Sequence, residues 1–523
     1  MLEVLRGASG RSRVGLLLLG VPFLLCLGTA PLFDVDEGAF AEASREMWAS
    51  ADFGHTTLNG VDRFDKPVAV YWLQALAIGL LGPGEWAVRL PSALCAWALC
   101  VAVAKFACTQ WGRATGGWAA VLLASNLGLL VIGRASTADA LLNLCLGLTA
   151  LDLCRHLMTG SAWPLRRAAL WVGIGVMTKG PVAVLIPGAT LCLWWLSYRD
   201  GKKARQALSD LWSWAIVLVV AAPWYLYAWG RHGEAFVNGF LVKHNLERFS
   251  SAMEGHAGSV LYFVVLLPVL WLPWTGLLVP VLARFRDQWT DPVSRFLVLW
   301  AAFVLTFFSL SDTKLPHYAL YAFVPLALLM ARQAVQHGPW LRAALWLGLG
   351  TWLALLTLLP WLAVTLGRRA DDPFYRALLG GAPLPGGHWL VVALAAGLLF
   401  WLTVDRWRSF QSRSCAAGVV CALVCVAWLW PWVGEVLQGP TRRAAWASVQ
   451  YSGSAVQWDV HWPSVGYYRE QPVPRRPPQP GELAFVRADR LTSHPLREDF
   501  DVLYKERSVA LVRRKAAADG QTP

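Results

Sequence analysis

Apolar runs long enough to cross a membrane recur along most of this 523-residue chain. A helix needs about 20 predominantly apolar residues to cross the hydrocarbon core of a bilayer. Charged residues make up 15% of the chain, which is too few for a soluble globular protein. The apolar runs centre on 14–32, 86–107, 116–133, 137–157, 168–178, 182–197, 212–230, 259–283, 294–310, 317–334, 341–366, 388–404 and 415–434. The sequence therefore predicts an α-helical polytopic membrane protein with about 13 transmembrane helices.

Basic residues in the short loops predict the orientation of these spans. With the N-terminus inside, the inside loops collect lysine and arginine, for example Arg166, Arg167, Lys202, Lys203 and Arg205. An odd number of spans then places the C-terminus outside. The formal net charge of +13 is explained by these loops, so we do not expect nucleic acid as a partner.

The polarity of the chain changes near residue 440. We expect a transmembrane domain over 1–438, with long outside loops near 33–85, 231–258 and 367–387. The tail at 439–523 is hydrophilic, and its short alternating runs at 482–487, 499–504 and 508–513 are typical of strands. The tail is therefore predicted to form a small α/β domain outside the membrane.

Two acidic residues, Asp36 and Glu37, follow directly on the first apolar run. Carboxylates beside the hydrocarbon boundary are costly unless they are paired or solvated in a cavity. Both are therefore candidates for a general base or a metal ligand. The alternative is a helix N-terminus with acidic residues in its first turn.

Further polar groups lie just before or after later spans. Asp65 and Lys66 precede an apolar helix that starts at Pro67, where a lysine can meet a phosphate as a compact cation. An interfacial salt bridge with a snorkelling lysine is the alternative. Asp139 falls at the start of a span, where it either faces a cavity or caps the helix. Lys179 lies in a short outside turn, for which nonspecific contact with lipid headgroups is the simpler explanation.

The loop at 231–258 carries His244, Arg248 and His256, and a histidine beside acidic groups can ligate a divalent metal. A histidine in such a loop is more often an ordinary surface residue. Lys314 and Tyr318 belong to a later polar turn that also has a purely structural interpretation.

These residues gain significance because the predicted topology places them all on the outer side. An active site for a phosphate-bearing lipid needs cations that neutralise the phosphate and a carboxylate that deprotonates an acceptor. The set on this side consists of Asp36, Asp65, Lys66, Asp139, Arg248, Lys314 and Tyr318.

These motifs also match a known family in order. The chain resembles the bacterial polyprenyl-phosphate-sugar-dependent glycosyltransferases related to aminoarabinose transferase and protein O-mannosyltransferase, which have the GT-C fold. The resemblance covers about residues 14–330, and each short motif alone is weak. The motifs are DEGAFAE at 36–42, SREM at 44–47, RFDKP at 63–67, YW at 71–72, RLPS at 89–92, KGP at 179–181, PWY at 223–225, ERF at 247–249 and KLPHY at 314–318.

The resemblance implies transfer of a sugar from undecaprenyl phosphate, or a similar carrier, to an acceptor such as lipid A, another glycan or a protein. The transfer would invert the anomeric carbon, and the active site would lie on the periplasmic side of a bacterial inner membrane. By resemblance the catalytic residues are Asp36, Glu37 and Asp139, the groups that bind the donor phosphate are Lys66, Arg248, Tyr318 and Lys314, and the ligands of a divalent metal cofactor are Asp65, His244 and His256.

Two departures from the family pattern concern the substrate. Ala39 stands where aminoarabinose transferase typically carries arginine, and Asp65 stands in place of a metal-binding glutamate. Both changes argue against aminoarabinose as the sugar. The alternative functions are a transporter or flippase for a lipid-linked sugar, and a lipid-binding assembly protein. Transporters tend to place their sites at the membrane midplane between internal repeats, whereas this set gathers at one surface.

Overall fold

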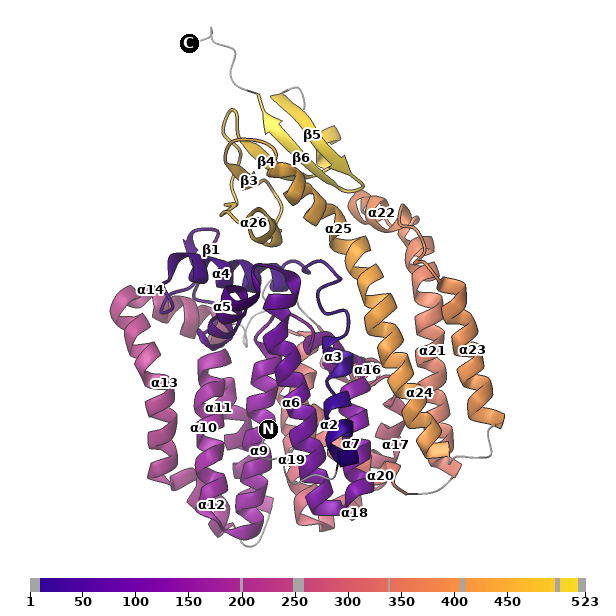
Figure 1. Ribbon diagram of the computed structural model, residues 1–523. Coiled ribbons are helices and arrows are strands. Elements are labelled where there is room, and N and C mark those ends of the chain that lie inside the picture. Colours follow the sequence, from indigo (N-terminus) through magenta and orange to yellow (C-terminus); the bar gives the residue numbers. More distant parts are fainter. Residues whose placement is uncertain are drawn as a thin grey trace.

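The computed structural model describes residues 10–197, 201–247, 258–336, 339–404, 410–493 and 499–515. It shows a bundle of long helices with a small sheet-containing region stacked on one end (Figure 1). Within those ranges, six helical stretches are long and apolar enough to cross a membrane. They are α6 (Glu85–Trp111), α9 (Asp139–Thr159), α13 (Leu211–His232), α19 (Pro292–Leu310), α21 (Pro339–Gly367) and the continuous stretch of α24 (Phe410–Val424), η4 (Cys425–Leu429) and α25 (Trp430–Ser448). The prediction of a multi-pass α-helical membrane protein is confirmed.

Helices also occupy the other predicted runs, but they are shorter, so the expected number of 13 spans is not confirmed. They include α10 (Ala162–Lys179), α11 (Val182–Ser197), α16 (Tyr262–Leu270), α17 (Leu278–Ala283), α20 (Phe323–Ala334) and α23 (His388–Val404). The run at 116–133 is divided by Asn126 into α7 (Arg113–Ser125) and α8 (Leu127–Ile132). The Asn126 amide donates to the carbonyls of Leu122 and Leu123 and accepts from the Leu129 N–H, so it ends one helix and caps the next.

The first predicted run is also divided, into α2 (Gly10–Leu18) and α3 (Val21–Leu24). The carbonyls at the end of this segment need partners, because no water is available in an apolar surrounding. The buried Arg134 guanidinium supplies them, donating to the carbonyls of Pro22, Phe23, Leu25 and Cys26 at 2.7–3.0 Å.

The interior of the bundle is built around α9, while α13 lies at its edge. In α9, 78% of the apolar stretch of the helix is buried inside the protein, whereas in α13 only 28% is buried. Large aromatic side chains fill the centre, including the fully buried Trp271, Trp274 and Trp300. The exposed apolar face of α13 is therefore the face that contacts lipid.

Short elements cross the end of the bundle that carries the C-terminal region (Figure 1). They are α4 (Asp36–Ser50), a hairpin of β1 (Thr57–Leu58) and β2 (Val61–Asp62), α5 (Ala69–Leu81), α14 (Glu234–Phe236) and the π-helix η1 (Val237–Glu247). At the opposite end lie α12 (Lys202–Ser209) and α18 (Phe285–Thr290). The two ends of the bundle thus differ in construction.

The C-terminal region contains a four-stranded sheet in the order β3-β4-β6-β5. β3 (Ala455–Gln457) pairs parallel with β4 (Leu483–Arg487), while β6 (Val509–Arg514) pairs antiparallel with β4 and with β5 (Phe500–Glu506). Strands β4, β5 and β6 lie at the three predicted positions. Helix α25 runs from the bundle to this sheet, so the expected boundary at 438/439 falls inside a continuous helix.

The C-terminal region also contacts the first loop. The carboxylate of Asp34 accepts hydrogen bonds from the backbone N–H and the hydroxyl of Ser464, at 2.9 and 2.5 Å. Ser464 begins α26 (Ser464–Arg469), and the Tyr468 hydroxyl in that helix accepts from the Leu32 N–H at 2.7 Å. The sheet-bearing region is therefore docked directly on the loop that leads into α4.

Candidate active site

Asp36 is the first residue of α4, at the end of the bundle that is covered by short helices. Its side chain is exposed, although nearby protein reduces its contact with solvent. The loss of solvent, together with the nearby charges of Asp139 and Asp65, raises the pKa of the Asp36 carboxyl above its usual range, while Lys179 and Lys66 oppose that shift. Asp36 therefore lies among four charged groups, and its carboxylate has the raised basicity of a candidate general base.

Asp139 and Lys179 form a buried ion pair beside Asp36. Asp139 begins α9 and Lys179 ends α10, and the Lys179 Nζ lies 2.5 Å from Asp139 Oδ1. The Tyr321 hydroxyl donates to the same Oδ1 at 2.9 Å. The His317 Nε2 lies 3.3 Å from the Lys179 Nζ. Both aromatic groups come from η3 (Pro316–Ala322), so two segments distant in sequence, α9 and η3, fix this lysine of α10 in place.

A second group of charged side chains, Arg63, Asp65 and Lys66, lies just before α5 in the sequence. The Arg63 guanidinium donates to Asp65 Oδ2 at 2.8 Å, and the Lys66 Nζ donates to the Asp65 carbonyl at 2.8 Å. The Lys66 Nζ also lies 3.6 Å from Asp65 Oδ1. A small, partly open pocket adjoins this group. Its lining consists of Gly54, His55, Thr56, Arg63, Phe64, Lys66, Trp224, Ala228, His232 and Phe236.

Glu37 is in a different environment from its neighbour Asp36. Its carboxylate is buried and accepts two hydrogen bonds from the Arg89 guanidinium, at 2.9 and 2.7 Å. It also accepts from the backbone N–H groups of Ser136 at 2.7 Å and Phe33 at 3.0 Å. Both carboxylate oxygens are thus occupied by protein donors, which makes Glu37 a positioning residue for the start of α4.

Lys314 and Tyr318, two predicted phosphate ligands, differ in their contacts. The buried Lys314 Nζ donates to the carbonyls of Ser309 at 2.7 Å and Phe308 at 3.4 Å, and also to that of Ser311, so it caps the end of α19. The Tyr318 ring packs 4.5 Å from the Phe308 ring, and the Lys179 Nζ lies 5.5 Å from the centre of the Tyr318 ring. Tyr318 therefore borders the buried ion pair, whereas Lys314 is directed at backbone carbonyls.

Three predicted residues cannot be placed with the others. Arg248 and His256 lie outside the described residues. His244 belongs to η1, but its side chain is also outside the description. Across the described ranges, no three His, Cys, Asp or Glu side chains are arranged to hold a metal ion.

The sequence did not point to three residues that the structure adds to the site. Arg63 belongs to the RFDKP motif but was not selected, Tyr321 lies beyond the end of the KLPHY motif, and Lys179 was interpreted as a headgroup contact. One feature of the sequence could have identified Lys179. It is a lysine in a very short outside turn, and the predicted topology places it on the same side of the membrane as Asp139. Only the packing of α9 against α10 shows that the two side chains meet.

Known proteins resemble this chain in sequence and in fold. Residues 65–227 match the family described as dolichyl-phosphate-mannose-protein mannosyltransferase. An undecaprenyl phosphate-alpha-4-amino-4-deoxy-L-arabinose arabinosyl transferase from Pseudomonas paraeruginosa is 30% identical over 433 residues, covering 79% of this chain and 74% of the relative. The protein of the same name from Pseudomonas aeruginosa strain PAO1 is 30% identical over 444 residues, covering 80% and 76%.

Two solved structures share the fold. The crystal structure of ArnT from Cupriavidus metallidurans bound to undecaprenyl phosphate superposes with a TM-score of 0.81 at 21% identity, covering 98% of this chain and 100% of that one. The archaeal oligosaccharyltransferase AglB from Archaeoglobus fulgidus gives a TM-score of 0.51 at 11% identity, covering 92% and 65%.

Proposed function

The chain belongs to the family of the undecaprenyl phosphate-alpha-4-amino-4-deoxy-L-arabinose arabinosyl transferases, which are membrane glycosyltransferases, and from that premise we propose the reaction that its site performs. The donor is a sugar linked to undecaprenyl phosphate, and the acceptor is a hydroxyl or amine of a glycolipid, another glycan or a protein. The observation that carries this proposal is Asp36, an exposed carboxylate close enough to the Asp65–Lys66 group and the Asp139–Lys179 pair for their charges to shift its pKa.

Asp36 is the general base of this reaction. Its carboxylate takes the proton of the acceptor hydroxyl while the acceptor oxygen forms a bond to the anomeric carbon. The bond between that carbon and the phosphate oxygen breaks, and its electron pair leaves with undecaprenyl phosphate. A single displacement of this kind inverts the anomeric carbon. The Asp36 proton then passes to solvent.

Lys66 offsets the negative charge that develops on the leaving phosphate. Its side chain is largely enclosed, and its Nζ is held by the Asp65 carbonyl, so the cation is preorganised. The adjoining pocket, lined by Lys66 and Arg63 together with aromatic rings, has a composition suited to the sugar phosphate.

Asp139 and Tyr321 act through Lys179. They hold the ammonium at 2.5 and 2.9 Å, where its charge lowers the pKa of Asp36 and so keeps part of that base ionised. Glu37 and Arg89 fix the backbone from which Asp36 projects. We assign these four side chains and Lys179 positioning roles.

A divalent metal would supply further charge stabilisation to the phosphate. In the described part of the chain, the Asp65 carboxylate is flanked by Arg63 and Lys66, which disfavour a cation at that position. The described residues alone thus do not fit a metal, and no step above passes through one. A site completed by His244 and His256 stays a prediction.

The site faces the periplasm in this proposal, and the membrane is the bacterial inner membrane. The helix α12, which begins with the exposed Lys202, lies at the opposite end of the bundle (Figure 1). The exposed Lys105 lies near the C-terminal end of α6 and the exposed Arg166 near the start of α10, in agreement with the rule that cytoplasmic loops are positive. The C-terminal sheet is on the same side as Asp36.

The test is a transfer assay with the full-length protein in liposomes. Undecaprenyl phosphate-4-amino-4-deoxy-L-arabinose is offered first, because the named relatives bear that sugar in their names, with other undecaprenyl-phosphate sugars in parallel. Lipid A and a peptide serve as acceptors, and mass spectrometry follows the glycosylated acceptor and the released undecaprenyl phosphate. The proposal predicts equimolar formation of both. Movement of the lipid-linked sugar between leaflets without its cleavage would establish a flippase instead.

A further inference from the structure

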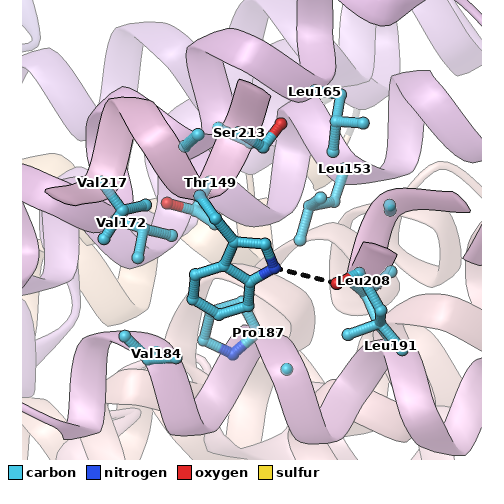
Figure 2. A pocket seen from close by; sticks show the side chains of 15 residues that line it. Thr149, Leu153, Leu165, Val172, Val184, Pro187, Leu191, Leu208, Ser213 and Val217 are labelled. Atoms are coloured by element: carbon cyan, nitrogen blue, oxygen red, sulfur yellow. Dashed lines mark hydrogen bonds between the residues drawn. The ribbon is translucent and has the colours of Figure 1, made fainter. Parts of the chain in front are cut away.

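A second pocket lies at the end of the bundle opposite Asp36. It is partly open to the outside and is lined by residues of α9, α10, α11, α12 and α13 (Figure 2). Thr149 and Leu153 line it, ten and fourteen residues after Asp139 on the same helix, which places them about 15 and about 21 Å from that end. The pocket is thus separate from the site described above.

The lining of this pocket is suited to hydrocarbon. Apart from Thr149 and Ser213 it is apolar, and the Ser213 hydroxyl is already used in donating to Asp210 at 2.6 Å. Trp214 also lines the pocket, and its indole N–H donates to the Leu208 carbonyl at 2.9 Å. The pocket is partly open and is not filled by side chains of the surrounding helices. Leaving it empty would forfeit the dispersion contacts that a packed interior makes.

The pocket borders the lipid phase. Leu218 and Val219 on α13 are 60% and 74% exposed, and Leu196 at the end of α11 is 82% exposed. These flanks face the bilayer, so a lipid chain can enter from the side. Trp163 and Trp212, both strongly exposed, lie at the level expected for headgroups.

Three exposed cations lie on helices that contribute residues to the pocket lining. Lys202 and Arg205 are exposed on α12, the helix that also supplies Ala207 and Leu208 to the lining. Arg166 is exposed on α10 next to the lining residue Leu165. These three cations have no ion pair within the described residues.

The neighbouring acids are already satisfied. Asp152 lies 2.7 Å from Arg155 and 2.5 Å from Arg167. Asp210 caps α13 by accepting from the Ser213 N–H. Charge at the headgroup end is therefore positive and open to an anion.

We propose that this pocket binds one acyl chain of an anionic phospholipid, with the lipid phosphate held by Lys202, Arg205 and Arg166. Basic pockets between helices on the cytoplasmic side of membrane proteins have the chemistry for such headgroups. The distance from Asp36 favours a resident phospholipid of the surrounding leaflet over the undecaprenyl chain of the donor.

Gly188 provides a direct test of the acyl site. It lines the pocket on α11, and a Cβ added there meets nothing within 4 Å, so a side chain can start from this position toward the pocket space. In Gly188→Phe, the affinity for phosphatidylglycerol should fall by at least about tenfold, because each methylene of the acyl chain that is kept out of the pocket costs about fourfold in affinity. Gly350→Phe is the matched control, since Gly350 on α21 also has open space around its Cβ position and lies outside the pocket.

The measurement is native mass spectrometry of delipidated full-length protein titrated with phosphatidylglycerol and, in parallel, with phosphatidylcholine. The parent and Gly350→Phe should retain one phosphatidylglycerol that Gly188→Phe loses, and phosphatidylcholine should not replace it. Equal retention by Gly188→Phe overturns the proposal, as does equal binding of the two lipids.

The proposed phosphate ligands Lys202 and Arg205 allow an independent test that leaves the lining of the pocket unchanged. Lys202→Gln/Arg205→Gln should weaken phosphatidylglycerol binding by roughly fivefold for each cation removed. Lys105→Gln/Arg286→Gln removes two other exposed cations at the same end and should leave binding unchanged. Added undecaprenyl phosphate should not displace the bound phosphatidylglycerol, and displacement would assign the pocket to the donor chain instead.

Discussion

Arg89 on α6 holds both carboxylate oxygens of Glu37 on α4, with Nε to Oε1 at 2.9 Å and Nη2 to Oε2 at 2.7 Å. The guanidinium is fully buried, and its other N–H groups donate to the carbonyls of Leu27, Ala30 and Pro31. One side chain thus connects a membrane span, the preceding loop and the first turn of α4. The position of Asp36 depends on this connection.

Removing one partner of the Arg89–Glu37 ion pair should lower the stability of the protein more than it directly affects the sugar-transfer step. Glu37→Ala leaves the Arg89 charge buried without its carboxylate, a change that typically costs about 3–5 kcal/mol. We expect a clear fall in the thermal unfolding midpoint in detergent, whereas Asp371→Asn, an exposed acidic control, should leave the midpoint unchanged. The double variant Glu37→Leu/Arg89→Leu should lose less than the two single changes together. An unchanged midpoint with lost transfer would instead show that Glu37 contacts the substrate.

The sequence predicted the helical membrane fold, because hydropathy over about 20 residues is a local property. It also predicted the sheet-forming runs after residue 480, because alternation is local too. It did not predict the breaks at Asn126 and after α2, which depend on single side chains that satisfy helix ends. Hydropathy averages over these residues.

For the site, the sequence identified Asp36 and Glu37 as a pair but could not assign them different environments. That difference arises because Arg89 lies 52 positions after Glu37 and reaches only one of the two carboxylates. The same limit applies to Lys314, which was grouped with Lys66 although its Nζ contacts the carbonyls at the end of α19. Side-chain direction is a tertiary property, and charge type and topology do not determine it.

Asp36→Asn should lower kcat for sugar transfer by about 10²–10⁴-fold, because the acceptor loses its general base. Binding of undecaprenyl phosphate should change little, since the asparagine keeps the shape of the side chain. A single-turnover assay together with a binding titration separates the two effects, and Asp371→Asn serves as the control. Transfer at the parent rate would remove Asp36 from the mechanism.

The pH dependence of kcat should report the environment of Asp36. Burial and then the Asp139 charge raise the pKa of the Asp36 carboxyl, so the rate of the parent should fall on acidification at a pH above the usual range for aspartate. Asp139→Asn removes a charge that raises this pKa and keeps a hydrogen-bonding group for Lys179. The acidic limb should then move to lower pH. A limb that stays in place, as expected for the control Asp371→Asn, would show that another group governs it.

Lys66 and Lys314 should respond differently to the same substitution. Lys66→Gln removes a cation from the donor site, and KM for the lipid-linked sugar should rise by roughly 10–100-fold, the usual worth of a hydrogen bond to a charged group. Lys314→Gln removes the cap of α19, so the unfolding midpoint should fall while KM stays near that of the parent. A rise in KM for Lys314→Gln comparable to that for Lys66→Gln would return Lys314 to the phosphate site.

The contact between Asp34 and Ser464 predicts that stability depends on pH. Burial raises the pKa of the Asp34 carboxyl from 3.8 to about 7, although the Ser464 hydroxyl and N–H oppose the shift. Between about pH 4 and about pH 7 the folded protein therefore holds a proton on Asp34 that the unfolded chain has lost, so the Asp34 contribution to stability falls as pH rises. Asp34→Asn cannot titrate, and the unfolding midpoint of the parent minus that of the variant should decrease across this window and level off above it. Ser464→Ala removes a group that lowers the pKa and should extend the decrease to higher pH. The difference between the parent and Asp371→Asn should be flat, and a flat difference for Asp34→Asn as well would show that this carboxyl does not titrate in the docked region.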